Sequence, residues 1–278
     1  MTVLAITGST GKVGGLIARQ IDSAGIPARL LVRDKSRAPE LLHTKVAVCS
    51  YGDAEASRQA LTGVEVLFMA SAHESADRVD EHESFLGAAA AAGVRHVIYL
   101  SFIGASGRSV FTLARDHGAS EEYIRNSGMT WTFLRNNFYS EMFPLFADSE
   151  GVIRGPAGLG RVAPVSQIDV AAVAAAILRD PQTHSHSTYD LTGPEALSLT
   201  EIAAILTRVT GKPHSFVNET LAEARASRAH YGAPAWQVDA WISTYTAIRD
   251  GELNAVSSDI GRLLGRPALG FAQALAAG

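Results

Sequence analysis

The fold of this chain is decided by one stretch, Val3-Leu4-Ala5-Ile6-Thr7-Gly8-Ser9-Thr10-Gly11-Lys12-Val13-Gly14. Its apolar start is typical of a buried strand, and three glycines follow where that strand gives way to a helix. In such a turn the first glycine permits a sharp bend, the second lets the backbone approach a pyrophosphate, and the third lets helix and strand pack closely. A turn that merely favours glycine is the alternative. The position directly after a strand favours a dinucleotide site, which we predict to contain Gly8, Ser9, Thr10, Gly11, Lys12 and Val13.

The rest of the first 135 residues continues the alternation of short apolar runs and helical stretches. We expect strands at 3–7, 28–33, 45–50, 64–70, 96–101 and 130–135, and helices at 12–24, 54–61, 80–92 and 115–127. Glycines 25, 63, 93 and 128 follow the four helices, where a left-handed cap is common. This order predicts an α/β fold of the Rossmann type, a doubly wound parallel sheet with helices on both faces.

The end of the second predicted strand bears on the choice of dinucleotide. An acidic residue there usually holds the ribose 2′-hydroxyl of NAD, but this chain continues as Arg33-Asp34-Lys35-Ser36-Arg37. The Arg33 guanidinium can form a fork with a 2′-phosphate. Asp34 could serve the ribose hydroxyl instead, or the whole loop could be solvated charge. Three cations beside one carboxylate favour a phosphate dianion, so we predict NADPH, with NADH possible at lower affinity.

Further cofactor contacts are predicted by their position at the carboxyl edge of the sheet, where ligands bind in doubly wound folds. Gly52 and Asp53 follow the third strand, and the Asp53 carboxylate could meet the adenine amino group or cap the helix that begins at residue 54. The ends of the fourth and fifth strands add Ala70, Ser71, Ala72, Ser101 and Phe102.

Beyond residue 135 the alternation loosens. Residues 151–164, rich in glycine and proline, predict a loop or short hairpin; 169–178 predict a helix, 188–191 a strand, and Ser198 and Glu201 a capping box that starts a helix at 202–209. From residue 219 onward we expect helices, broken at 232–234 and at 266–267. We expect residues 1–138 to form an NADP-binding Rossmann domain that also receives 165–192. Residues 139–164 and 193–278 would form a smaller, mostly helical substrate-binding domain.

Composition narrows the class of protein. The 278 residues carry a net charge of −4, which gives no reason to expect nucleic acid as a partner. Cys49 is the single cysteine, so no intramolecular disulfide can form. The histidines lack metal-ligand spacing, apart from His184 and His186 in a polar loop, and we expect no metal. The chain opens with no basic leader and no membrane-length apolar run, so we expect a cytoplasmic monomer or homodimer with no membrane partner.

Several motifs together resemble one family. They are the glycine-rich turn, Leu31-Val32-Arg33, Tyr51-Gly52-Asp53, the segments 93–97, 117–125 and 132–139, and Tyr189-Asp190-Leu191-Thr192-Gly193. With them the chain resembles an atypical short-chain dehydrogenase/reductase of the NmrA-like family, and within it the group of NAD(P)H:quinone oxidoreductase type 2 and triphenylmethane reductase. The resemblance covers nearly the whole chain. It implies a Rossmann domain, a small C-terminal substrate domain, and NADPH with a flat acceptor in the cleft between them.

One motif of the wider family is missing. Short-chain dehydrogenases that reduce carbonyls generally use a Tyr-x-x-x-Lys pair, in which the tyrosine protonates the developing alkoxide. If Glu121 marks the family's usual carboxylate on that helix, Leu113 stands in the place of the tyrosine and His117 in that of the lysine. Tyr123 is no substitute, since Ser127 stands four residues later. A conjugated acceptor spreads the new charge and can take its proton from water, so this absence suits a quinone or similar aromatic molecule.

We therefore predict an NADPH-dependent reductase that transfers hydride to a quinone-like acceptor. His117, Asn136 and Tyr139 are its predicted catalytic residues; His117 would hold the ribose or steady negative charge, or be an ordinary core histidine. Phe138 and Tyr139 could offer flat faces to an aromatic ligand or pack in the core. Trp236, Trp241 and Tyr245 are expected to pack in the protein interior, with a place in the substrate pocket as the alternative. The alternative function is a non-catalytic sensor that binds NADP(H) and reports the cofactor ratio to a partner.

Overall fold

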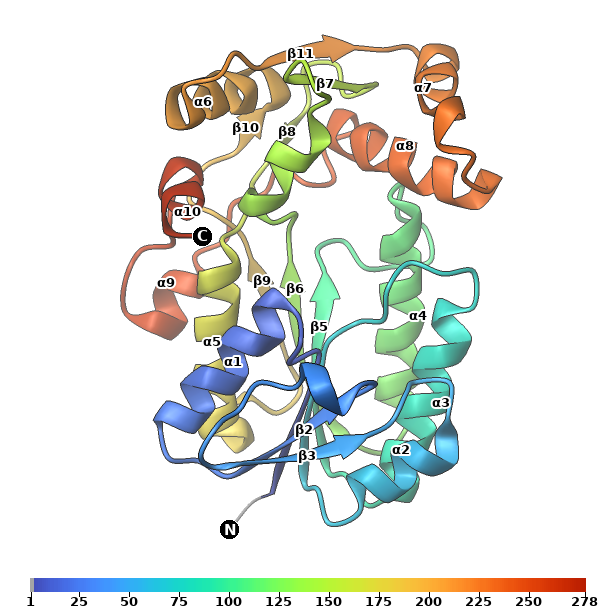
Figure 1. The fold of residues 1–278 in the computed structure, drawn as a ribbon, viewed down its shortest axis with the longest axis vertical. Helices are drawn as coiled ribbons and strands as arrows, with labels where there is room; N and C mark the ends of the chain where they lie inside the picture. The colour runs from blue at the N-terminus through green and yellow to red at the C-terminus, as the bar shows by residue number, and fades with distance from the viewer. Residues whose placement is uncertain (1–2) are drawn as a thin grey trace.

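The central feature of the computed structural model, which describes residues 3–278, is a parallel sheet (Figure 1). Among these residues it has seven strands in the order β3-β2-β1-β4-β5-β6-β9, every neighbouring pair parallel. Residues 1 and 2, counted in the predicted first domain, lie outside the described part. The predicted Rossmann-type fold is confirmed. The strands are β1 (Leu4–Thr7), β2 (Ala28–Val32), β3 (Thr44–Val48), β4 (Val66–Met69), β5 (His96–Phe102), β6 (Thr130–Asn136) and β9 (Ser187–Leu191).

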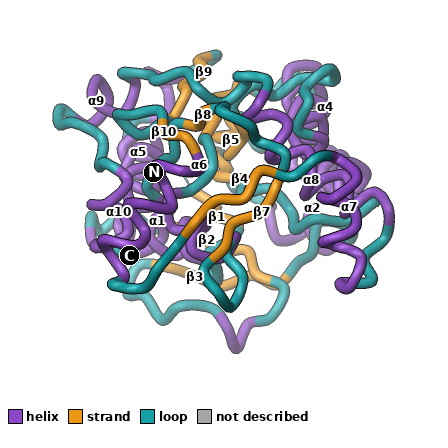
Figure 2. Tube along the Cα trace, turned by 90° about the horizontal axis from the view of Figure 1, so that it is seen from above, coloured by secondary structure: helices purple, strands orange, loops and turns teal. Residues whose placement is uncertain are grey.

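Helices cover both faces of this sheet, as Figures 1 and 2 show. On one face lie α1 (Lys12–Ser23) and α5 (Gln167–Arg179), and on the other α2 (Ala54–Leu61), α3 (Arg78–Ala91) and α4 (Thr112–Asn126). Each face has its own apolar core, because the strands are buried on both sides. The four predicted capping glycines all adopt positive φ, between 68° and 88°. Helix α4 begins three residues before its predicted start, because Phe111 precedes it as an extended N-cap that carries no polar signal in the sequence.

The remaining elements stand over the carboxyl edge of the sheet (Figure 1). They include a 3₁₀ segment at Ser140–Phe146, the strand pairs β7 (Val152–Gly155) with β11 (Ser215–Asn218) and β8 (Arg161–Val162) with β10 (Leu197–Ser198), and the helices α6 (Leu199–Thr210), α7 (Leu221–Arg228), α8 (Ala235–Arg249) and α10 (Phe271–Ala277). The predicted capping box of Ser198 and Glu201 is confirmed. The short hairpin, one of the two alternatives predicted for 151–164, is wrong: β7 and β8 do not pair with each other but with β11 and β10, far along the chain.

Contacts between the two regions bear on the predicted division. Segment 165–192 lies with the main sheet, since β9 pairs with β6 and α5 packs against α1. Helix α9 (Asp259–Leu264), which we assigned to the second region, places Ile260 in the core of the first. A third core joins Phe102 and Phe111 of the sheet region to α6 and α8. The division into two domains itself stays a prediction. Within residues 3–278, no helix is both long and apolar enough to cross a membrane.

Candidate functional site

The glycine-rich turn has the geometry that its sequence predicts. Gly8 adopts φ +68°, and a Cβ there would lie 2.9 Å from the Ala70 Cβ. A Cβ on Gly14 would lie 2.3 Å from the Gly8 carbonyl oxygen, so only glycine lets α1 approach β1 this closely. The Gly11 amide donates to the Gly8 carbonyl at 2.9 Å and closes the turn.

The start of α1 suits an anion. Its N-cap is Gly11, which has no side chain to occupy the free amides of the first helical turn. The Ser9 hydroxyl is buried and lacks a hydrogen-bond partner among the described residues. Free amides at the positive end of a helix dipole, beside an unsatisfied hydroxyl, fit the pyrophosphate of a dinucleotide. Lys12 is turned elsewhere, since its Nζ donates to the Gly278 carbonyl at 3.3 Å.

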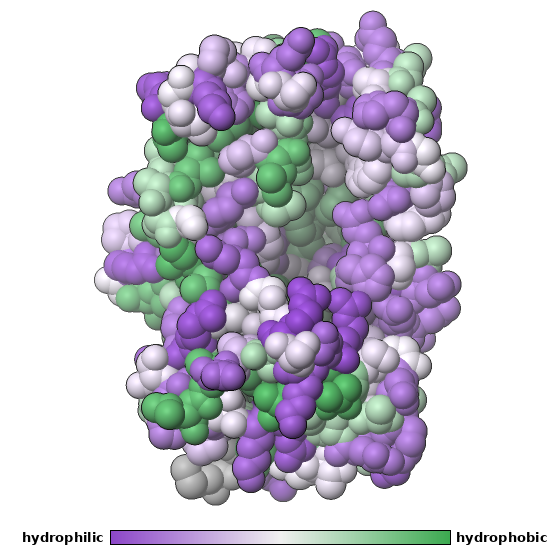
Figure 3. Space-filling model, viewed as in Figure 1, coloured by the Kyte–Doolittle hydropathy of each residue, from purple (hydrophilic) through white to green (hydrophobic). Residues whose placement is uncertain are grey.

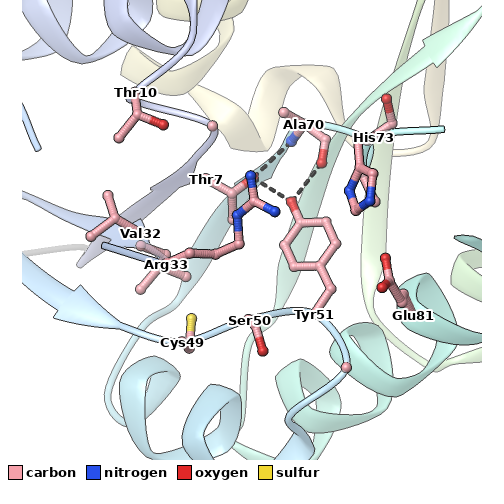
Figure 4. Close-up of a pocket in the computed structure, with 15 residues that line it drawn as sticks. Thr7, Thr10, Val32, Arg33, Cys49, Ser50, Tyr51, Ala70, His73 and Glu81 are labelled. Atoms are coloured by element: carbon pink, nitrogen blue, oxygen red, sulfur yellow. Dashed lines mark hydrogen bonds between the residues drawn. The ribbon is translucent and has the colours of Figure 1, made fainter. Parts of the chain in front are cut away.

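A cavity of about 280 Å³ extends from this turn along the ends of β2, β3 and β4. Figure 4 shows the Arg33 side chain reaching into it, toward Tyr51 and Ala70. Asp34 does not line it: its carboxylate accepts from the Ser36 amide at 2.9 Å and hydroxyl at 2.7 Å, and these bonds lower its pKa. The predicted cofactor residues that line the cavity are Gly8, Thr10, Arg33, Gly52, Ala70, Ser71 and Ala72.

Two other predicted cofactor residues have structural partners. Asp53 accepts from the Ala56 amide at 2.9 Å, so the helix-capping alternative is confirmed. The Ser101 hydroxyl donates to the fully buried Glu121 carboxylate at 2.6 Å and is itself 1% exposed. Successive side chains of a strand point to opposite faces, so its neighbour Phe102 faces a second cavity instead. Ser9, Gly11 and Val13 lie in the turn and at the start of α1.

Tyr51 also lines this cavity, although it is not among the predicted cofactor residues. Its hydroxyl is hydrogen-bonded to the Thr7 hydroxyl at 2.7 Å and to the Ala70 carbonyl, and its ring stacks on Phe85. Burial raises the pKa of Tyr51 well above its usual value, so it stays a neutral phenol. The bonds tie the ends of β1, β3 and β4 together beneath the cavity (Figure 4). In the sequence, the signal that could have indicated this role is the position of Tyr51 directly before the predicted cofactor residue Gly52.

The second cavity, of about 550 Å³, lies between the carboxyl edge of the sheet and the elements that stand over it, where Figure 3 shows the molecule hollowed. Ser71 lines both cavities, so they adjoin. The rings of Phe102 and Phe138 lie 5.0 Å apart, and Phe111 completes the cluster. The lining is largely aromatic and aliphatic, with the side chains of Phe102, Phe111, Leu113, Phe138, Tyr139, Met142, Leu145, Phe146 and Trp241.

The structure brings the three predicted catalytic residues together in this second cavity, which His117, Asn136 and Tyr139 all line. Phe138 belongs both to the cavity wall and to the partly buried margin of the core. Tyr245 packs against Gly155 as expected, but the expectation that Trp241 packs in the interior is wrong. Trp241 reaches the cavity because α8 crosses over it, a placement that only tertiary structure fixes.

His117 is a buried and neutral member of this wall. Its Nε2 lies 3.0 Å from an Nη of Arg78, and since a guanidinium only donates, Nε2 must accept. Its Nδ1 therefore carries the proton and lies 2.9 Å from the Tyr99 hydroxyl. Burial, and then the Arg78 charge, hold the pKa of His117 well below its usual value.

Two more buried histidines are neutral for the same reason. Burial lowers the pKa of His82 to about 3 and that of His96 to about 4. His82 accepts from the Ala72 amide at 2.8 Å and hydrogen-bonds Ser120 at 2.7 Å, which holds the loop after β4 against α4. His82, His96 and His117 are called the three buried histidines below.

Comparisons with known proteins agree with this geometry. The NAD(P)H azoreductase of Xenophilus azovorans is 32% identical over 277 residues, covering 98% of this chain and 96% of that protein. Quinone oxidoreductase 2 of Escherichia coli (strain K12) is 32% identical over 281 residues, covering 98% of this chain and 97% of the relative.

Solved structures are similar along the whole chain. The E. coli NADPH-dependent quinone oxidoreductase complexed with NADPH superposes with a TM-score of 0.89 at 32% identity, over 99% of both chains. The triphenylmethane reductase of Citrobacter sp. complexed with NADP(H) superposes with a TM-score of 0.85 at 27% identity, also over 99% of both. These similarities confirm the resemblance stated from the sequence. The model of the NAD(P)H-binding family matches residues 8–181, and the chain belongs to that family.

Proposed function

We propose that this protein is an NADPH-dependent reductase that transfers hydride to a quinone or a similar flat, conjugated acceptor. The observation that carries the proposal is the pair of adjoining cavities. One runs from the glycine-rich turn past Arg33, and the other is walled by aromatic side chains. Ser71 belongs to both, so a ligand in each would meet at that residue.

The first cavity binds the dinucleotide. The amides at the start of α1 receive the pyrophosphate, and Arg33 receives the 2′-phosphate, which favours NADPH over NADH. Gly52, Ala70, Ser71 and Ala72 supply close backbone contact along the rest of the cofactor. When bound, the reduced nicotinamide supplies the hydride.

The second cavity binds the acceptor. Phe138, Tyr139 and Trp241 offer aromatic faces on which a flat ligand can stack, and Asn136 offers a polar edge. Its volume of about 550 Å³ suits a molecule of two or three fused rings, since ligand cavities commonly span about 300–1,000 Å³. An apolar wall also excludes water from the place where the ligands meet.

Proton delivery by a Tyr-x-x-x-Lys pair plays no part in the proposed reaction. If Glu121 marks the family's usual carboxylate, the positions of such a pair hold Leu113 and His117, and both side chains line the second cavity. Leucine has no proton to give, and the His117 Nδ1–H is directed at Tyr99. The proposed acceptor is therefore one whose reduced form is stable enough to collect its proton from water. The names of the azoreductase and quinone oxidoreductase relatives support this class of acceptor.

The test is a turnover measurement with the purified protein, NADPH and a small water-soluble naphthoquinone. Loss of the reduced-nicotinamide absorbance and hydroquinone formation should proceed together, one for one, over many turnovers. A control with NADH in place of NADPH should require more cofactor for the same rate. Tight NADPH binding without turnover, across quinones, azo dyes and nitroaromatics, would instead identify a sensor of the cofactor ratio.

A further inference from the structure

Arg78 is a buried cation in the wall of the second cavity, and it has no role in the reaction proposed above. It is the first residue of α3 and is 5% exposed. It lines the second cavity beside His117. A buried arginine is costly unless its charge is balanced and its donors are used, so its partners decide its role.

Those partners leave much of the guanidinium unused. One Nη donates to His117 at 3.0 Å, and the other lies 3.4 Å from the Asp116 carboxylate, a long contact for an ion pair. Its Nε–H is buried and has no hydrogen-bond partner within residues 3–278. A guanidinium carries five N–H donors, so most of this capacity is free. Native proteins rarely leave such a buried donor unsatisfied, so the free donors of Arg78 need an explanation.

The charged and titratable neighbours of Arg78 come from α4, α3, β5 and the loop before α3. Asp116 on α4 is half-buried, and burial raises its pKa, with Arg78 acting in the opposite direction. His117 and His82 are neutral, and Tyr99 on β5 stays protonated because burial raises its pKa. Glu74 also lines the cavity but is exposed, so water screens its charge. Among the described residues that line this cavity, Arg78 is therefore the only cationic side chain, and its carboxylate partner lies at the long distance of 3.4 Å.

We propose that Arg78 is a catalytic residue that stabilises the negative charge which hydride transfer places on the acceptor, and that His117 is a positioning residue that holds its guanidinium. This inference rests on the proposed function and narrows its substrate class. A neutral quinone that takes up a hydride, and with it two electrons from NADPH, becomes a hydroquinone monoanion, which then takes a proton from water. A preorganised donor beside that oxygen lowers the barrier. A cationic dye that accepts a hydride becomes neutral, so Arg78 gives it no such help.

The experiment compares two acceptors in two variants. Arg78→Met removes the charge and keeps the bulk, and Arg78→Lys keeps the charge without the planar fork. Arg78→Met should slow naphthoquinone reduction by about 100-fold or more, in kcat rather than KM, the effect expected from loss of one charge-stabilising donor. The same variant should reduce a cationic triarylmethane dye at an unchanged or higher rate. Arg78→Lys should recover part of the quinone rate. Arg179→Met, an exposed arginine at the end of α5, is the matched control.

A second measurement needs no turnover. 4-Nitrophenol, whose phenolate is coloured, stands in for the hydroquinone anion in a titration with protein alone. The wild type should lower the pKa of the bound phenol by about 1–3 units, as a close cation does, and Arg78→Met should abolish the shift. His117→Gln, which can still accept from Arg78, should keep it, and His117→Leu should reduce it.

The outcomes separate this inference from the proposed function. If the wild type reduces neither acceptor, the proposed function fails, and the phenol titration still decides the role of Arg78. Equal slowing of quinone and dye by Arg78→Met, with no change in the phenol pKa, would make Arg78 structural and overturn the inference. An undisturbed quinone rate would overturn it as well. If Arg78→Met does not fold, the pKa of bound 4-nitrophenol is compared between the wild type and Arg78→Lys. No lowering of this pKa in either protein would refute the inference.

Discussion

The replacement of Arg33 by alanine tests how this chain distinguishes NADPH from NADH. Arg33 lines the first cavity and lies in an exposed position at the end of β2. In bulk water a pair of unit charges 4 Å apart gains about 1 kcal/mol, and near a protein surface about 4 kcal/mol. Since Arg33 is exposed, its attraction to the phosphate should lie toward the smaller of these two energies, and the double charge of the phosphate raises it somewhat. A charged hydrogen bond of about 1.5–3 kcal/mol is the resulting expectation.

That energy corresponds to a Kd for NADPH raised about 10- to 150-fold, with the Kd for NADH nearly unchanged. Isothermal titration of both cofactors at two salt concentrations measures it, and the discrimination should shrink at higher salt. Arg37→Ala is the matched control, because Arg37 is exposed on the same loop but does not line the cavity. Equal losses for NADPH and NADH would refute the 2′-phosphate contact, as would an equal effect of Arg37→Ala.

Three further changes test other parts of the structure. Gly14→Ala should lower the free energy of unfolding in urea by about 1–3 kcal/mol and weaken NADPH binding, because the new Cβ meets the Gly8 carbonyl. The control Gly107→Ala should have neither effect, because the space around Gly107 is open. The three buried histidines are neutral when folded but titrate near 6.5 when unfolded, so the unfolded state binds more protons below that pH. The free energy of unfolding should therefore decrease by about 4 kcal/mol as the pH is lowered from 7.5 to 5.5. A free energy of unfolding that stays constant over this range would contradict the assignment of these histidines as neutral. Glu121→Gln should cost about 3 kcal/mol in the same assay, since Glu121 is fully buried between two arginines, and a loss below 1 kcal/mol would contradict a buried ion pair.

The glycine-rich turn of the first cavity could be predicted from the sequence because its residues are close together in the chain. Gly8, Gly11 and Gly14 are close together in the chain, and each is required by the bend or the contact that its own neighbours make. Arg33 follows a strand whose end must lie at the same edge of the sheet, since all strands are parallel. Short-range periodicity therefore predicted the fold and this turn, but it did not reveal the other contacts of Asp53, Ser101 and Phe102.

The acceptor cavity could be predicted only in part, because its walls come from segments distant in sequence. Asn136 and Tyr139 were found because they follow β6 at the sheet edge. Trp241 was not, since the direction in which α8 crosses the cavity depends on packing against β8 and α4 rather than on its own sequence. Arg78 gave no signal either: an arginine at a helix start ordinarily faces solvent, and only the packing of α3 against α4 buries it.

The loop between β4 and α3 links the two halves of the site. His82 accepts a hydrogen bond from the backbone amide of Ala72 in this loop, and Ser71 lines both cavities. The loop ends where α3 begins, at Arg78, which lies in the wall of the second cavity. His82 and Arg78 lie one helical turn apart on α3 and are both fixed by α4, through Ser120 and His117. The pairing of α3 with α4 therefore sets the position of the cofactor-side backbone and of the acceptor-side cation together. In the proposed reductase, α4 would therefore act through α3, because it holds the helix that carries Arg78 in the wall of the second cavity.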